Sequence, residues 1–215
     1  MAISVRGVVR KYRGVTTGFT VRDVIAGGSA SMAVSLLSRL TAMACQEHEF
    51  DFSECIYGGT AAFEQTWSHI RVRIRLDPDA GITATTMNSL RTAWQNGIRT
   101  IWSNRWGVER AGEASCPLTF EVQWVTSNPH HIVRVRPGPA RSNSGIWDTL
   151  DTGAVAAHEF GHMLGLVDEY ADANCPHRNP VNTGTVMDSN SNVVPQRLMT
   201  RFAKNIDSVV VPLGD

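Results

Sequence analysis

The stretch AVAAHEFGHMLGLVDEY, residues 154–170, combines small apolar residues with two histidines and three acidic residues. Its alanine-rich start and apolar spacing predict a buried α-helix, from Thr152 to about Val167. Residues four apart lie on one face of a helix, so His158 and His162 project their imidazoles toward a common point. Burial of ionisable side chains is costly without partners, and a shared metal ion removes that cost. The stretch therefore predicts a metal site on a buried helix.

The metal expected at this site is zinc. Two histidines at this spacing on a helix are typical ligands of a catalytic Zn²⁺ ion. Glu159 follows His158 directly, so it lies beside the metal, where it can take a proton from a water molecule that zinc activates. We therefore expect one catalytic zinc ion, with His158 and His162 as ligands and Glu159 as the general base.

A third ligand is expected just beyond the helix. Gly165 can adopt positive φ, which ends the helix and turns the chain back. That turn brings Asp168 toward the metal and leaves a fourth position open for water. Glu169, His177 and Asp188 remain alternative ligands. No glutamate follows Glu169, which excludes a glutamate ligand from a later helix.

Further elements surround this motif on both sides. Apolar and charged residues alternate over residues 70–76, which predicts a half-buried strand whose Arg71, Arg73 and Arg75 form a solvated face. The remaining predictions are a helix over residues 83–106, strands over 118–125 and 132–136, and a final helix over 195–206. The order of these elements indicates an α/β (α+β) fold with a small sheet packed on two long helices, followed by a C-terminal helix.

Residues 1–65 differ in texture from the rest of the chain. A helix is predicted from about residue 29 to 43, and Gly58-Gly59 marks a change of composition. We see no catalytic chemistry in this segment. We expect it to be an accessory segment for control, docking or delivery, with the catalytic domain in residues 66–215. The alternative is that the segment completes the core.

Length and charge limit the classes of function. The 215 residues suffice for one sizeable core. Lys+Arg and Asp+Glu balance at 20 each, and the pI is near 7.1, so no global field favours nucleic acid. No apolar run is long enough to span a bilayer. The first residues have no apolar stretch typical of a secretory signal, so we expect a cytoplasmic protein or export by a signal-independent route.

The four cysteines are Cys45, Cys55, Cys116 and Cys175. Their spacing does not match a cysteine metal site. An even number permits disulfides, with three possible connectivities, but we favour unpaired thiols packed as small hydrophobic residues.

The motif and its continuation resemble the metzincin clan of zinc endopeptidases. The pattern HExxHxxGxxD is that of the snapalysin-like members, and a tight turn at Thr185–Asp188 resembles the clan's Met-turn. The resemblance covers roughly residues 70–206 and implies a metzincin-like catalytic domain with a small twisted mixed sheet. The residues that it assigns are His158, His162 and Asp168 as zinc ligands, Glu159 as general base, Gly165 as the turn and Met187 as the floor of the site.

This resemblance implies hydrolysis of peptide bonds in protein or peptide substrates. Two other functions stay open: a zinc hydrolase of another amide, such as a peptidoglycan peptide, and a non-catalytic, metal-stabilised interaction domain. The presence of Glu159 argues against the latter, since a structural site needs no base. Some metzincins place an oxyanion-stabilising tyrosine two residues after the Met-turn methionine. Ser189 stands there in this chain, and Tyr170 is the only tyrosine near the motif.

Overall fold

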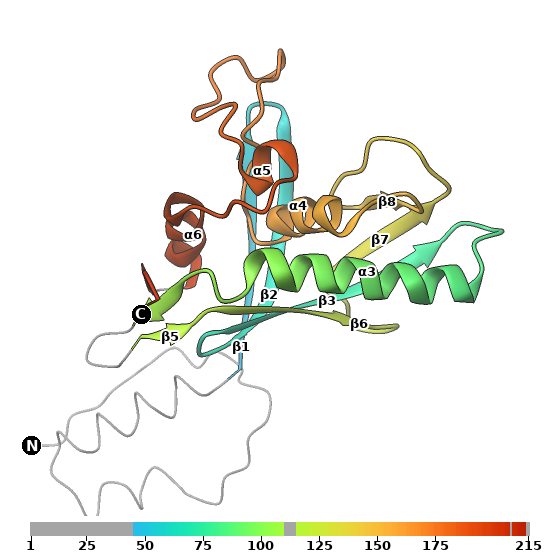
Figure 1. Cartoon of the computed structure of the whole chain (residues 1–215), viewed down its shortest axis with the longest axis horizontal. Helices are drawn as coiled ribbons and strands as arrows, with labels where there is room; N and C mark the ends of the chain where they lie inside the picture. The colour runs from blue at the N-terminus through green and yellow to red at the C-terminus, as the bar shows by residue number, and fades with distance from the viewer. Residues whose placement is uncertain (1–44, 110–114, 207, 214–215) are drawn as a thin grey trace, which may run out of the picture. The chain divides into compact units, whose positions relative to one another are not determined.

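The computed structural model describes residues 45–109, 115–206 and 208–213 (Figure 1). The chain divides into two compact units, residues 1–46 and 47–215. The helix predicted near residues 29–43 lies outside the described residues. The architecture below is that of the second unit, with Gln46 included as the first residue of a strand.

A six-stranded mixed sheet forms the centre of this unit. Its strands are β1 (Gln46–Glu54), β2 (Tyr57–Thr66), β3 (His69–Pro78), β6 (Thr119–Trp124), β7 (His131–Arg136) and β8 (Ile146–Asp148). The order is β1-β2-β3-β7-β8, and β6 also pairs with β3. β2 is antiparallel to β3, whereas the β3–β6, β3–β7 and β7–β8 pairs are parallel. The strands predicted at residues 70–76, 118–125 and 132–136 therefore correspond to β3, β6 and β7.

Strand β3 lies in the middle of the sheet, and its buried and less buried residues alternate strictly over residues 69–76. Ile70, Val72 and Ile74 are fully buried on one face. The arginines between them point to the other face, where Arg71 pairs with Glu121 and Arg75 pairs with Asp77. This face is the ion-paired, solvated surface expected from the alternation.

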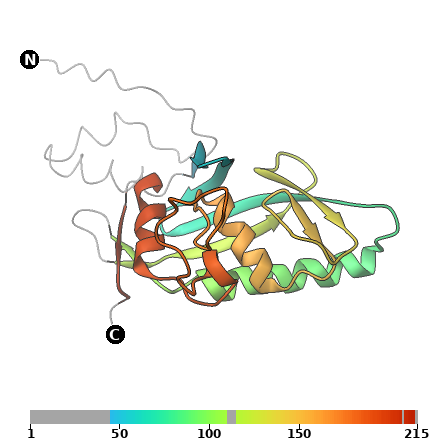
Figure 2. The same cartoon turned by 90° about the horizontal axis from the view of Figure 1, so that it is seen from above.

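Two helices pack against the sheet and against each other. Helix α3 (Ala84–Trp102) runs along β6, and α4 (Gly153–Met163) lies beside α3 and contacts β2 (Figures 1 and 2). The Trp102 indole N–H donates to the carbonyl of Ala157 over 2.9 Å, which fixes α4 on α3. Trp94 and Trp147 meet edge to face in the same core, with ring centroids 4.9 Å apart.

Both long helices end earlier than the sequence predicts. Helix α3 stops at Trp102, four residues before the predicted end, and Asn104 has a φ of 57° that no helix continues through. Helix α4 stops at Met163, because Gly165 takes a φ of 85°. Apolar spacing extends past both ends, so periodicity alone overestimates their length.

Short elements complete the unit, most of them in its C-terminal part. These are α5 (Val186–Ser189), α6 (Gln196–Ala203), a 3-10 turn (Lys204–Ile206) and a three-stranded antiparallel sheet of β4 (Gly107–Glu109), β5 (Cys116–Pro117) and β9 (Val209–Val211). The predicted tight turn at Thr185–Asp188 is thus a single helical turn, and the final helix ends in 3-10 geometry. The predicted α/β class, with a mixed sheet, two long helices and a C-terminal helix, is confirmed. Within the described ranges, no helix is both long and apolar enough to cross a bilayer.

The sheet begins before the predicted domain boundary near residue 65. Residues 46–66 form the hairpin of β1 and β2, whose Ala61 and Phe63 are fully buried. A disulfide joins Cys55, in the turn of this hairpin, to Cys175 in the loop after α4. The favoured interpretation of unpaired thiols is therefore wrong for this pair. A role of residues 1–65 in control, docking or delivery stays a prediction.

We predict that a chain starting at residue 45 folds, whereas one starting at residue 66 does not. The shorter chain loses β1, β2 and the disulfide, which exposes one edge of β3 and removes the buried Ala61 and Phe63 from the core. Circular dichroism and size-exclusion chromatography of both fragments check this. A monomeric residue 66–215 fragment with cooperative unfolding would instead support the boundary predicted from the sequence.

Candidate metal centre

Helix α4 presents His158 and His162 one turn apart, with their ring centroids separated by 5.0 Å. Each Nδ1 lies 2.8 Å from a backbone carbonyl, that of Val186 for His158 and that of Leu166 for His162. A carbonyl only accepts hydrogen bonds, so each Nδ1 carries the proton and donates it. Both Nε2 atoms are therefore left as lone-pair donors to a metal, an orientation common among zinc-binding histidines.

Asp168 faces both imidazoles. The chain reverses at Gly165, where a side chain would also collide with the ring of Phe50. Beyond this turn, Oδ1 of Asp168 lies 3.1 Å from Nε2 of His158 and 3.2 Å from Nε2 of His162. Ligand atoms about 2.0–2.2 Å from a tetrahedral zinc ion are separated by about 3.3 Å. Three electron-pair donors thus converge with the spacing that one small cation requires.

The electrostatics of these residues also favour a cation. Although burial lowers the pKa of His162, hydrogen bonding and charge from Asp168 raise it overall. Burial likewise opposes ionisation of Asp168, but hydrogen bonds with His158 and His162 lower the pKa of its carboxyl well below the usual range. A proton and a metal ion therefore compete for the same position between these side chains.

Glu159 stands beside the two histidines with an unused oxygen. One atom each of His158, Glu159 and His162 lie within 4.8 Å of one another. Glu159 is only 5% exposed, and its Oε2 has no hydrogen-bond partner. Burial raises the pKa of its carboxyl, an effect that His162 and His158 oppose. A buried and unpaired carboxylate oxygen is costly, so this side chain is available to a ligand or water in the site.

Met187 lies beneath the helix that carries the histidines. It is fully buried in α5, which packs on α4. A Cβ at position 161 would overlap its sulfur and lie 3.1 Å from the Trp102 ring, so only glycine allows this approach. The same turn of chain supplies the Val186 carbonyl that orients His158. Helix α5 thus supports the site from below and fixes one of the imidazoles.

The alternative third ligands lie differently. Glu169 is fully buried and pairs with Arg197 while accepting hydrogen bonds from Thr183 and Thr185 over 2.8 and 2.7 Å. His177 is exposed and does not line the pocket around the histidines. Asp188 does line it, but its Oδ2 accepts the backbone N–H of Gly184 over 2.6 Å. Only Asp168 contacts both imidazoles among these four residues.

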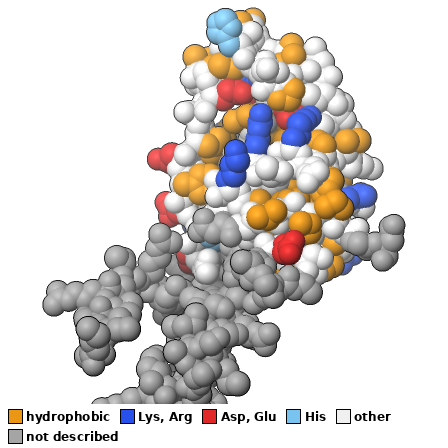
Figure 3. All heavy atoms as spheres, turned by 90° about the vertical axis from the view of Figure 1, so that its left-hand side faces the viewer, with side chains coloured by type: hydrophobic (Ala, Val, Ile, Leu, Met, Phe, Trp, Pro, Cys, Tyr) orange, Lys and Arg blue, Asp and Glu red, His pale blue; other side chains and the backbone are white. Residues whose placement is uncertain are grey.

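Glu169 connects the site to the outer surface of α6. Figure 3 views the molecule from the side on which α6 lies in Figure 1, where several basic side chains gather. From α6, Arg197 pairs with Glu169, and Arg201 lies 4.0 Å from it. Burial alone would raise the pKa of Glu169, yet the hydrogen bonds of Arg197 and Thr185 lower it overall.

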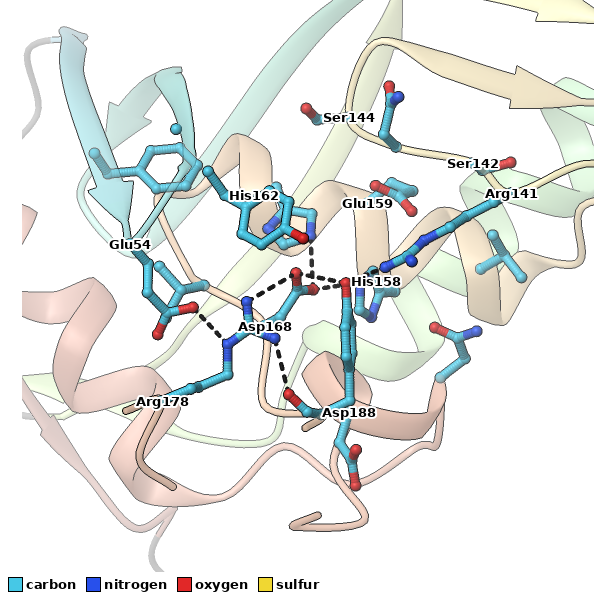
Figure 4. Close-up of a pocket in the computed structure, with 18 of the residues that line it drawn as sticks. Glu54, Arg141, Ser142, Ser144, His158, Glu159, His162, Asp168, Arg178 and Asp188 are labelled. Atoms are coloured by element: carbon cyan, nitrogen blue, oxygen red, sulfur yellow. Dashed lines mark hydrogen bonds and ion pairs between the residues drawn. The ribbon is translucent and has the colours of Figure 1, made fainter. Parts of the chain in front are cut away.

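Sequence patterns do not reveal several residues of this site. The pocket has a volume of about 670 Å³ and is lined by residues from the β1–β2 hairpin, the loop before β8 and the loop after α4. They include Tyr170 together with Glu54, Arg141 and Arg178. Figure 4 shows the last three around the histidines and Asp168. The Tyr170 hydroxyl donates to Oδ2 of Asp168 over 2.8 Å and accepts from Arg141. These residues are far apart in sequence, and the only local signal was the position of Tyr170 near the motif.

Residues 137–202 match the model of the immune inhibitor A peptidase M6 catalytic domain. This match supports a zinc metallopeptidase of the metzincin type. The matched range holds α4, the turn to Asp168, α5 and most of α6, and it leaves β1, β2, β3 and α3 outside. Neither a search of curated proteins nor one of solved structures gave a match. The metallopeptidase assignment therefore rests on the segment that carries the site.

We predict that Glu169→Gln lowers the free energy of unfolding by about 2 kcal/mol at pH 7, because the buried side chain no longer offers a charged acceptor to Arg197, Thr183 and Thr185. The native pKa of Glu169 is lowered, so its contribution is present above the pKa of an unfolded glutamate, about 4.3, and is lost as the pH falls toward the lower native pKa. Urea unfolding at about pH 7 and about pH 3.5 checks this. Glu121→Gln, in a half-exposed pair with Arg71, serves as the control and should cost less than about 1 kcal/mol. Equal losses in both variants would contradict the structural role assigned to Glu169.

Proposed function

We propose that the chain is a zinc-dependent endopeptidase that hydrolyses peptide bonds within protein or peptide substrates. In this proposal one Zn²⁺ ion is held by His158, His162 and Asp168, and Glu159 is the general base. The observation that carries it is the convergence of two Nε2 atoms and one carboxylate oxygen beside the unpaired oxygen of Glu159. The metallopeptidase match over residues 137–202 agrees with it.

The donor set fits a catalytic rather than a structural zinc site. Two imidazole nitrogens and one carboxylate oxygen are ligands of catalytic zinc, and three protein ligands leave a fourth position for water or substrate. The pocket over these residues is large enough to admit a peptide segment. A non-catalytic metal site would gain nothing from burying Glu159 next to the metal without a partner.

Zinc, when bound, supplies Lewis-acid polarisation of water and of the substrate carbonyl. Glu159 then accepts a proton at Oε2 from the attacking water and donates it to the nitrogen of the leaving amine. The Oε2 atom of Glu159 has no hydrogen-bond partner in its buried position, so it is free to accept the proton and to return it. The Val186 and Leu166 carbonyls keep both imidazoles in the tautomer that binds metal.

Gly165 and Met187 have supporting roles in this proposal. The positive φ of Gly165 directs the chain so that Asp168 returns to the histidines. Met187 forms the floor on which α4 rests, close against Gly161. Neither residue contacts the substrate in this scheme.

We expect the purified protein to bind about one zinc ion per chain and to lose activity with a strong chelator. Asp168→Ala should lose zinc at a chelator concentration that the wild type withstands, because a ligand is removed. Asp188→Ala is the matched control and should keep its zinc, since Asp188 accepts a backbone hydrogen bond and faces no imidazole. Elemental analysis after dialysis measures both variants. Zinc loss in the Asp188 variant alone would overturn the ligand assignment.

We expect Glu159→Gln to lower turnover by about a hundredfold or more while zinc content and melting temperature change little. Glutamine keeps the shape of the side chain but cannot accept the proton. A peptide library from a digested proteome, analysed by mass spectrometry, should show internal cleavages with the wild type and not with the variant. Cleavage confined to chain ends would argue against an endopeptidase, and undiminished cleavage by the variant would argue against Glu159 as the base.

A further inference from the structure

Arg178 is a buried cation beside the proposed third ligand. Only 1% of its side chain is exposed. Its Nε donates to Oε2 of Glu54 over 2.6 Å, and its Nη1 donates to the carbonyl of Tyr170 over 2.8 Å. Its Nη2 lies 3.6 Å from Oδ2 of Asp168, the oxygen turned away from the histidines. Figure 4 shows the guanidinium between Glu54 and Asp168.

Aromatic rings further restrict this guanidinium. Its Cζ lies 4.9 Å from the centre of the Tyr170 ring and 5.8 Å from that of the Tyr57 ring, both within the range of cation–π contacts. Tyr170 follows the third ligand by two residues, and Tyr57 begins β2. Arg178 therefore joins two segments that meet only in the folded chain. Each of its three guanidinium nitrogens faces an oxygen atom, from Glu54, Tyr170 or Asp168.

A covalent bond holds the same two segments together. The Cys55–Cys175 disulfide ties the hairpin turn to the loop after α4, and the backbone N–H of Arg178 donates to the carbonyl of Cys175 over 3.0 Å. The position of Arg178 along the loop is thereby fixed close to the hairpin. Glu54, one residue before Cys55, is held where it can pair with the guanidinium.

The charges of this cluster explain how a guanidinium can lie near a metal ion. An isolated positive charge at this distance would oppose the binding of a divalent cation. Glu54 compensates that charge, so the Arg178–Glu54 pair is neutral as a unit. The effect of Arg178 on the site is then to orient the Asp168 carboxylate. Arg178 and Tyr170 both face its Oδ2, so its Oδ1 faces the imidazoles. Partners of this kind raise metal affinity by fixing the ligand before the ion arrives.

We propose that Arg178 is a positioning residue of the metal centre, which orients Asp168. In this proposal the tip of the β1–β2 hairpin holds Arg178 in place through Glu54, Cys55 and Tyr57. This inference rests on the proposed role of Asp168 as a zinc ligand. It gives the hairpin a function in metal binding, although the hairpin lies outside the segment matched by the peptidase family and inside the segment predicted to be accessory.

The test measures metal affinity of the full chain without any substrate. Zinc dissociation constants are determined by competition with a chromophoric chelator, and the cobalt(II)-loaded protein is compared by its visible absorption, which reports ligand geometry. We expect Arg178→Met to weaken zinc binding by about 10- to 100-fold and to change the cobalt spectrum. Arg134→Met is the control. Arg134 pairs with Asp79, and neither residue lines the pocket or belongs to a candidate metal-binding group among the described residues.

A merely structural role of Arg178 predicts a different outcome, in which Arg178→Met loses thermal stability while both arginine variants keep the wild-type zinc affinity and cobalt spectrum. That result would overturn the inference. If Arg178→Met does not fold, Glu54→Gln decides, since it keeps the guanidinium and its rings but removes the compensating charge. We expect it to weaken zinc binding by about threefold to tenfold, and an unchanged affinity would overturn the inference.

The same measurements separate this inference from the proposed function. A wild-type chain that binds neither zinc nor cobalt would rule out the proposed zinc site. An Asp168→Ala variant with wild-type affinity would rule out Asp168 as its third ligand. In a third case, the wild type binds zinc, Asp168→Ala does not, and Arg178→Met has wild-type affinity. That result would leave the proposed function intact and rule out only the role of Arg178.

Discussion

The Nε2 atoms of His158 and His162 on α4 face one carboxylate oxygen of Asp168. None of these three atoms carries a proton when the ring proton of each histidine is on Nδ1 and is donated to a backbone carbonyl. This arrangement is stable only with positive charge at its centre, from a metal ion or a proton. The need to hold these groups in place bears on much of the surrounding structure. The carbonyl that orients His158 comes from α5, so α5 must lie under α4, and Gly161 must lack a side chain to allow it.

The need to hold Asp168 in place also involves the β1–β2 hairpin of the sheet. Asp168 has a second oxygen, and Tyr170 and Arg178 occupy the space around it. Because Arg178 is a cation close to the proposed metal site, its charge has to be compensated. Glu54 at the end of β1 provides the compensating carboxylate. The hairpin is therefore joined to the site by charge, by aromatic contacts and by the Cys55–Cys175 disulfide. Its buried Phe63 also contributes to the core beside β3, so one element serves both packing and the site.

Glu159 and Glu169 show how two buried carboxylates of one segment acquire different roles. Glu169 is surrounded by donors, with Arg197, Thr183 and Thr185 around it, and its pKa is lowered. Glu159 has an oxygen without a donor, which suits the proposed exchange of protons with water or substrate. The difference arises from the partners that the fold brings to each carboxylate and not from the residue type.

The sequence by itself determined the local part of this protein. The spacing of His158 and His162 fixes both on one face of α4 because a helix repeats every 3.6 residues, and the alternation in residues 70–76 fixes the faces of β3. Only the tertiary structure decided that Asp168, rather than Glu169 or Asp188, faces the imidazoles, that the hairpin of β1 and β2 belongs to the sheet, and that Arg178 meets Glu54. The contacts of the hairpin and of Arg178 join residues up to 124 positions apart. They depend on how the segments pack, and a pairing over such distances leaves no periodic pattern in the chain from which it could be predicted.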